Sequence, residues 1–155
     1  MAKRILVPLE KSHESECLVP FVAQAARNGQ ATVQLLHVAP VPEGWTDEYG
    51  RVLSYADQEM QRLEAEGLDY LQAIEMQFEN TSVECAVRLG DPVTEILNEA
   101  KAFGADLIAV STVGRSGVGR VLLGSVAEQI FRKSRIPVVL MRPGDTMMGS
   151  SPGWE

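Results

Sequence analysis

Short apolar runs alternate with longer amphipathic segments along the whole chain. A short continuous apolar run is typical of a strand that is buried on both faces of a sheet. Apolar residues spaced three and four apart are typical of a helix that packs by one face. The predicted strands are residues 3–9, 32–38, 82–89, 107–112 and 137–141. The predicted helices run over residues 12 to about 28, 54 to about 79, 92–103 and 125 to about 134.

The prolines and one alternating strand refine this pattern. In residues 82–89 the apolar side chains occupy every second position, which predicts a half-exposed edge strand. Pro137, at the first residue of the last predicted strand, fits the opposite edge, because a proline has no N–H for a sheet ladder. Pro20 falls in the first turns of the first helix, where a proline is tolerated or causes a small kink.

The order of elements predicts an α/β fold with a five-stranded open parallel sheet. Strands that alternate with helices are joined by right-handed crossovers, so the helices cover both faces in an α/β/α sandwich. In the strand order 3-2-1-4-5, ligands bind at the carboxyl ends of the strands where the order reverses. That point lies between the first and fourth strands, next to Glu10 and Ser111.

A glycine-rich loop follows the fourth strand and leads into the last helix. Gly114, Gly117 and Gly119 fall within this loop, and Gly124 and Ser125 open the helix. Glycines let a backbone approach a ligand closely, and the N–H groups at a helix start attract anions. The arrangement predicts a phosphate site. Its alternative interpretation is a mobile surface loop that only connects two elements.

Composition narrows the possible functions. The chain has 155 residues and a net charge of −7, which argues against nucleic-acid binding and against an anionic membrane surface. Cys17 and Cys85 have no metal-ligand or redox spacing and suit a reducing cytoplasm. No apolar run is typical of a signal peptide or a membrane span. We expect one domain over residues 1–143 and a flexible tail over residues 144–155.

The chain resembles the universal stress protein family, from ILVPLEKS through LLHV and GDPVTEIL to the glycine-rich loop and the last strand. The family's nucleotide signature is Gly, two residues, Gly, nine residues, then Gly and Ser or Thr. Gly114 and Gly124-Ser125 match it in type and spacing, whereas Ser111 replaces the first glycine. Glu10 stands where nucleotide-binding members typically carry an Asp.

The resemblance implies a flavodoxin-like (Rossmann-like) fold and a homodimer formed through the last strand, Pro137 to Met141. It also implies ATP or AMP binding in members that keep the motif, and no established reaction. Glu10 is a candidate ligand for a Mg²⁺ ion that accompanies the nucleotide. The predicted nucleotide-binding residues are Pro8, Leu9, Glu10, Val38, Val110, Ser111, Gly114, Arg115, Gly117, Gly124, Ser125 and Val126.

Each of these side chains also has a purely structural interpretation. Val38 can be a core residue, Glu10 can cap the following helix, and Arg115 can be simply solvated. Trp45 and Tyr49 either cover the pocket, contact a partner or simply pack against the protein. His37 is expected to be half-buried in the core, and the two cysteines to be inert.

Three hypotheses follow. The first is a cytoplasmic, dimeric, adenine-nucleotide-binding regulator of a stress response with an unidentified protein partner. The second is a dimeric interaction protein of the same fold that has lost nucleotide binding, because Ser111 and Glu10 depart from the family pattern. The third is weak ATP hydrolysis, although the sequence contains no recognisable catalytic constellation.

Overall fold

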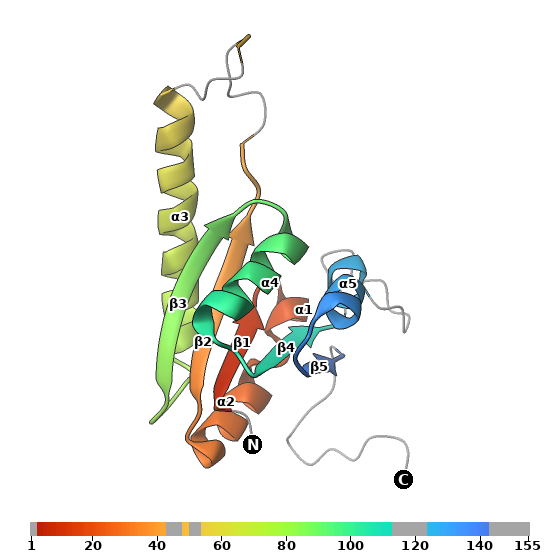
Figure 1. Cartoon of the computed structure of the whole chain (residues 1–155). Helices are drawn as coiled ribbons and strands as arrows, with labels where there is room; N and C mark the ends of the chain where they lie inside the picture. The colour runs from red at the N-terminus through yellow and green to blue at the C-terminus, as the bar shows by residue number, and fades with distance from the viewer. Residues whose placement is uncertain (1–2, 43–47, 50–53, 113–123, 143–155) are drawn as a thin grey trace.

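The computed structural model describes residues 3–42, 48–49, 54–112 and 124–142 (Figure 1). Five parallel strands form one sheet in the order β3-β2-β1-β4-β5, which confirms the predicted fold class and strand order. The strands are β1 (Arg4–Pro8), β2 (Thr32–Ala39), β3 (Ser82–Leu89), β4 (Leu107–Ser111) and β5 (Val138–Met141). As predicted, β3 and β5 are the two edges.

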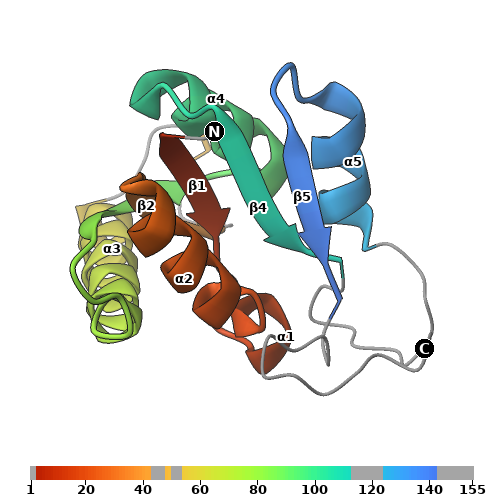
Figure 2. The ribbon, with the colours of Figure 1, turned by 90° about the horizontal axis from the view of Figure 1, so that it is seen from below.

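Helices cover both faces of the sheet (Figure 2). They are α1 (His13–Glu16), α2 (Val19–Gly29), α3 (Ser54–Glu75), α4 (Pro92–Phe103) and α5 (Ser125–Lys133). Residues of α2 and α3 form one hydrophobic core with the sheet, whereas residues of α4 and α5 form a second core on the opposite face. The central strands contribute to both cores because successive side chains of a strand point to opposite faces.

The first predicted helix is in fact two helices. α1 ends at Glu16 and α2 begins at Val19, with Cys17 and Leu18 between them. Pro20 explains the break: it has no N–H to donate to the carbonyl four residues earlier, so it fits the first turn of a new helix. Ala25 is exposed, although it follows the buried Val22 by three residues and so has the helical spacing of the core side.

Some boundaries differ from the prediction by a few residues. α3 ends at Glu75 rather than near Glu79, and the chain leaves the helix through two turn bonds, from Gln77 N–H to the carbonyl of Ile74 and from Phe78 N–H to that of Glu75. Pro137 lies just before β5 and not within it, although its carbonyl accepts a bond from β4.

One glycine brings α3 close to the sheet. Gly67 is buried, and a Cβ atom built there would lie 2.8 Å from Cγ2 of Val87 and 3.2 Å from Cδ2 of His37. Since real Cβ atoms essentially never show a contact under 3.0 Å, a larger residue would push α3 away from β2 and β3. None of the described helices is both long and apolar enough to cross a membrane.

Candidate functional site

The loop after β1 is fixed by hydrogen bonds at the carboxyl end of the sheet. The N–H of Leu9 donates to the carbonyl of Leu36 at 2.8 Å, and that of Glu10 donates to Oγ of Ser15 at 2.9 Å. Ser12 caps α1, because its Oγ accepts the N–H of Ser15 at 3.1 Å. Lys11 has a φ of 58°, in the left-handed region. This loop therefore has a defined shape beside the point where the strand order reverses.

A buried polar group lies behind this loop. His37 is only 6% exposed, and its Nδ1 is 2.8 Å from the carbonyl oxygen of Leu9. Its ring meets that of Tyr70 edge to face, with centroids 5.9 Å apart. The Tyr70 hydroxyl donates to Oε2 of Glu16 at 2.7 Å, and burial, with the adjacent carboxylate, raises the pKa of Tyr70 well above its usual value. These contacts tie α3 and α1 to the base of the loop.

A pocket of about 380 Å³ opens at the switch point of the sheet. This volume falls within the usual range for small-molecule sites. We call it the switch-point pocket, and it is lined by Pro8, Leu9, Glu10, Ser15, Leu36, Val38, Pro92, Ile96, Val110, Ser111, Gly124, Ser125, Val126 and Ala127.

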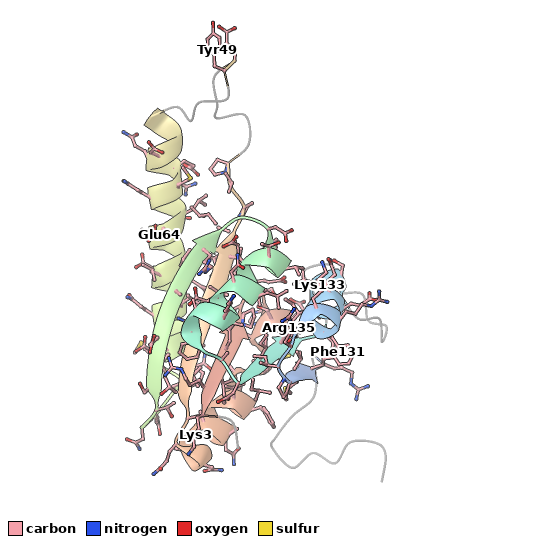
Figure 3. The ribbon with its side chains drawn as sticks, viewed as in Figure 1. Lys3, Tyr49, Glu64, Phe131, Lys133 and Arg135 are labelled. Carbon is pink, nitrogen blue, oxygen red and sulfur yellow. The ribbon has the colours of Figure 1, made fainter. Side chains whose placement is uncertain are left out.

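The structure brings together every predicted site residue that it describes. All nine, from Pro8, Leu9, Glu10 and Val38 to the residues of β4 and the start of α5, line this one pocket. The predicted residues Gly114, Arg115 and Gly117, together with Gly119, lie outside the described residues, as do Trp45 and the tail over residues 144–155. Tyr49 is 75% exposed and does not line the pocket; Figure 3 shows it far from β4 and α5.

The start of α5 supplies the site's anion-binding chemistry. Gly124 is the N-cap with φ −60° and ψ 152°, a conformation open to any residue. Its own N–H donates to the carbonyl of Thr112 at 2.5 Å, so that donor is already used. The following N–H groups, at Ser125 and Val126, have no acceptor within the helix, as in every α-helix. With the positive end of the helix dipole they favour an anion in the pocket.

Glu10 is the carboxylate of the pocket, and its Oε2 atom is buried. The described part of the chain brings together no group of three or more His, Cys, Asp or Glu side chains that could hold a metal by themselves. Mg²⁺, however, is commonly bound through one or two carboxylates together with substrate phosphates and waters. A single carboxylate that lines the same pocket as a helix start fits that kind of site.

The two cysteines differ in their surroundings. Sγ of Cys17 lies 3.9 Å from Oγ of Ser111, next to the pocket. Cys85 lies on the α3 face of β3, where burial and a 3.3 Å hydrogen bond to Glu75 raise the pKa of its thiol to about 12. A thiol with this pKa is protonated at neutral pH, in keeping with the inert role expected for it.

Sequence reasoning missed several residues that line the pocket. Ser15 holds the Glu10 amide, and Leu36, Pro92, Ile96 and Ala127 add apolar wall. Pro92 follows the turn at the end of β3. Because ligands bind at the carboxyl ends of parallel strands, this position in the sequence could have identified it. Leu36, Ile96 and Ala127 belong to faces that the apolar pattern assigns only to the core.

Comparison with known proteins places the whole domain in one family. The sequence profile of the universal stress protein family matches residues 1–142. The universal stress protein YxiE of Bacillus subtilis is 28% identical over 148 residues, which span 92% of this chain and 100% of that protein. The universal stress protein MJ0531 of Methanocaldococcus jannaschii is 27% identical over 144 residues, or 90% and 82% of the two chains.

Solved structures share the fold. That of MJ0577 from M. jannaschii has a TM-score of 0.77 and 25% identity, and covers 93% of this chain and 98% of its own. A universal stress protein in complex with cAMP has a TM-score of 0.61 at 22% identity, and the match covers 92% of this chain and 98% of that one. A universal stress protein of Archaeoglobus fulgidus in complex with dAMP has a TM-score of 0.56 at 20% identity, and the match covers 89% of this chain and 96% of that one.

Proposed function

This chain belongs to the universal stress protein family, and from that premise we propose that it binds an adenine nucleotide in the switch-point pocket. In this proposal the protein is a dimeric, cytoplasmic regulatory module of a stress response. A partner protein then responds to whether a nucleotide is bound and to how many phosphates that nucleotide carries. The proposal contains a binding event and no catalytic step.

The observation that carries the proposal is the chemistry of one pocket with two unlike ends. Val38, Ile96 and Val110 give it an apolar wall suited to a base, whereas Ser125 and Val126 give it a helix start suited to phosphate. The complexes of two structural relatives with cAMP and dAMP support an adenine nucleotide as the occupant.

ATP and AMP would use this pocket differently. The carboxylate of Glu10 repels phosphate oxygens unless a cation lies between them, and a triphosphate offers more oxygens to share Mg²⁺ with that carboxylate. We therefore assign Glu10 as the protein's ligand for an ATP-bound Mg²⁺. AMP, in contrast, would bind without a metal.

Dimerisation through β5 completes the proposal. β5 is an edge strand, and its four residues, Val138–Met141, are all half-buried. Natural proteins rarely leave an apolar edge strand open. Pairing with the same strand of a second copy across a two-fold axis would cover it.

Isothermal titration with ATP and AMP, each with Mg²⁺ and with EDTA, tests the proposal. The variant Gly124→Asp places a carboxylate at the phosphate end of the pocket, yet Asp is a favourable N-cap, so α5 is not weakened. Gly124→Ser is its matched control, since serine also caps a helix but adds no charge. We expect Gly124→Asp to abolish binding and Gly124→Ser to retain it.

The same titration decides between the two leading hypotheses. If the unmodified protein gives no heat and no thermal shift with millimolar ATP or AMP, nucleotide binding is wrong and the protein is an interaction module of the same fold. If Ser111→Gly with Glu10→Asp then creates binding, the two departures from the family pattern are the reason for its loss.

A further inference from the structure

A second hollow lies at the end of the sheet opposite to the switch-point pocket. It has a volume of about 610 Å³ and is lined by Leu97, Ala100, Lys101, Gly104, Ala105, Lys133, Arg135 and Ile136. We call it the α4–α5 hollow. Figure 2 shows the ends of α4 and α5 next to the starts of β4 and β5 on this side of the molecule.

Hydrogen bonds hold the rim of the α4–α5 hollow in a defined shape. α4 ends at Gly104, whose φ of 72° is left-handed, and the next N–H, of Ala105, donates to the carbonyl of Ala100 at 2.9 Å. After α5, Oγ of Ser134 donates to the carbonyl of Ile136 at 2.7 Å and accepts the N–H of Ile136 at 3.1 Å. The hollow is therefore present before any ligand arrives.

The rim carries three cations in a chain of net charge −7. Among the described residues Lys101, Lys133 and Arg135 form no ion pair, whereas the neighbouring Arg132 pairs with Glu128 at 2.8 Å. Lys133 lies near enough to Asp91 to contribute to the lowered pKa of that carboxyl, without contacting it. Figure 3 labels Lys133 and Arg135 beside the end of α5.

Helix dipoles explain the positions of two of these three cations. Lysines in the last turn stabilise the negative end of a helix, and Lys101 and Lys133 occupy that position in α4 and α5. Arg135 lies beyond α5 and has no such role. Nor does the dipole explain why the three cations surround a hollow with an apolar floor of Leu97, Ala100 and Ile136.

We propose that the α4–α5 hollow docks an acidic peptide segment of a partner protein, which inserts one apolar side chain between the cations. The apolar floor takes the side chain, and Lys101, Lys133 and Arg135 take the flanking carboxylates. Complementary charge at a rim of this kind steers association and selects the partner.

The helix ends favour a peptide over a phosphate ligand. Phosphates bind at helix starts, where N–H groups and the positive end of the dipole face them. Two helix ends meet at the α4–α5 hollow instead, where no helix-start N–H groups face a ligand and the negative ends of both dipoles disfavour a doubly charged phosphate. Several of the last carbonyls already accept hydrogen bonds, so a peptide would bind through its side chains. Its carboxylates each carry a single charge and can reach the separate cations of the rim, while one apolar side chain fills the floor.

This docking site is tested by selecting short random peptides from a phage-displayed library. The affinity of the enriched sequences is then measured by fluorescence anisotropy. We expect enriched peptides to carry Asp or Glu on both sides of an aliphatic or aromatic residue. Their binding to the double variant Lys101→Glu/Arg135→Glu is expected to be at least about tenfold weaker, and to weaken with added salt.

The control variant is Arg27→Glu/Arg62→Glu, which changes the net charge equally but lies on α2 and α3. It should bind the selected peptides as the unmodified protein does, and circular dichroism should give the same helix content for both double variants. Enrichment of peptides without acidic residues, equal binding by both variants, or no enrichment over an empty support overturns the proposal. The selection is run with and without AMP, so its result does not depend on nucleotide binding.

Discussion

Nδ1 of His37 lies 2.8 Å from the carbonyl oxygen of Leu9, and this contact joins the carboxyl-terminal part of β2 to the loop at the base of the switch-point pocket. A carbonyl oxygen only accepts hydrogen bonds, so Nδ1 must carry the proton and donate it. The neutral form of His37 is therefore the Nδ1–H tautomer. Because His37 is buried, the nitrogen that carries its proton decides whether the loop after β1 keeps this hydrogen bond.

Replacing His37 tests how much this bond stabilises the pocket. His37→Phe keeps a ring but leaves the Leu9 carbonyl without its imidazole donor, which should lower the free energy of unfolding by about 1–3 kcal/mol. Urea unfolding measures the loss, and long-range nitrogen NMR of the unmodified protein should report the Nδ1–H tautomer. Tyr70→Phe, which removes only the hydroxyl bond to Glu16, should leave the tautomer unchanged; an Nε2–H tautomer in either protein would contradict this assignment.

Gly67 gives a second stability prediction. In an open helix, Gly67→Ala would be stabilising by about 1 kcal/mol, because alanine has the higher helix propensity. Here its Cβ would lie 2.8 Å from Cγ2 of Val87, so we expect a net loss of about 1–3 kcal/mol in thermal or urea unfolding.

A double-mutant cycle separates the clash from other effects of Gly67→Ala. Val87→Ala removes the Cγ2 atom, so Gly67→Ala should cost much less, or stabilise, in that background. An equal cost in both backgrounds would mean that the contact with Val87 is not what requires glycine.

The fold was predictable because its signals are local. The apolar run around Leu6 and the helical spacing in α4 each identify one element, and the alternation of elements then fixes the parallel sheet and its switch point. The same reasoning brought Glu10 and Ser111 to one pocket, since both follow strands that meet where the order reverses.

Contacts between distant elements could not be predicted in this way. The bond from His37 to Leu9 depends on the loop geometry after β1, and the nearby packing depends on how closely α3 approaches at Gly67. Likewise, the bond from the Gly124 N–H to the Thr112 carbonyl joins the start of α5 to the end of β4, and no local pattern in the sequence indicates it. The break at Pro20 is different: a missing N–H was visible in the sequence, but the choice between a kink and two helices was not.

The raised pKa of Cys85 predicts how stability changes at alkaline pH. The thiol titrates at about 12 in the folded protein and near its ordinary 9.0 when unfolded. Above pH 9 the unfolded chain therefore loses this proton first, which makes stability fall as the pH rises from about 9 towards 12. Tyr70, whose pKa is also raised, adds a loss of the same sign at higher pH.

Cys85→Ala should therefore reduce the decline in the urea midpoint between about pH 9 and about pH 10. Val83→Ala, on the same face of β3, shortens a side chain of the same core without removing a titrating group. It should keep the slope of the unmodified protein, and an identical slope in Cys85→Ala would rule out this thiol as the cause.

The hydrogen-bonding direction of β5 allows the proposed dimer to be tested with single prolines. The carbonyls of Pro137 and Met141 accept bonds from Ile108 and Thr112, so residues 137, 139 and 141 face β4. By the alternation of a strand, the N–H of Val138 points to the open edge. Val138→Pro should therefore remove a bond only from a strand added at this edge.

Light scattering after gel filtration should find a dimer for the unmodified protein and a monomer for Val138→Pro, with circular dichroism unchanged. Val139→Pro is the matched control, because it removes an N–H on the β4 side and should lower stability instead. A dimer that survives Val138→Pro does not form through β5.

Glu10 provides the sharpest prediction, because its effect on ATP affinity should change sign with the metal. With Mg²⁺ present, Glu10→Gln loses a charged ligand and should bind ATP at least about tenfold more weakly, equivalent to about 1.4 kcal/mol. In EDTA the same variant should bind ATP more tightly than the unmodified protein, since a neutral amide no longer repels the phosphates. Glu14→Gln, which makes the same change in charge on α1 outside the pocket lining, should alter neither affinity appreciably. A loss of affinity in both conditions would mean that Glu10 shapes the loop rather than holding the metal, because only a metal ligand gives opposite signs with and without Mg²⁺.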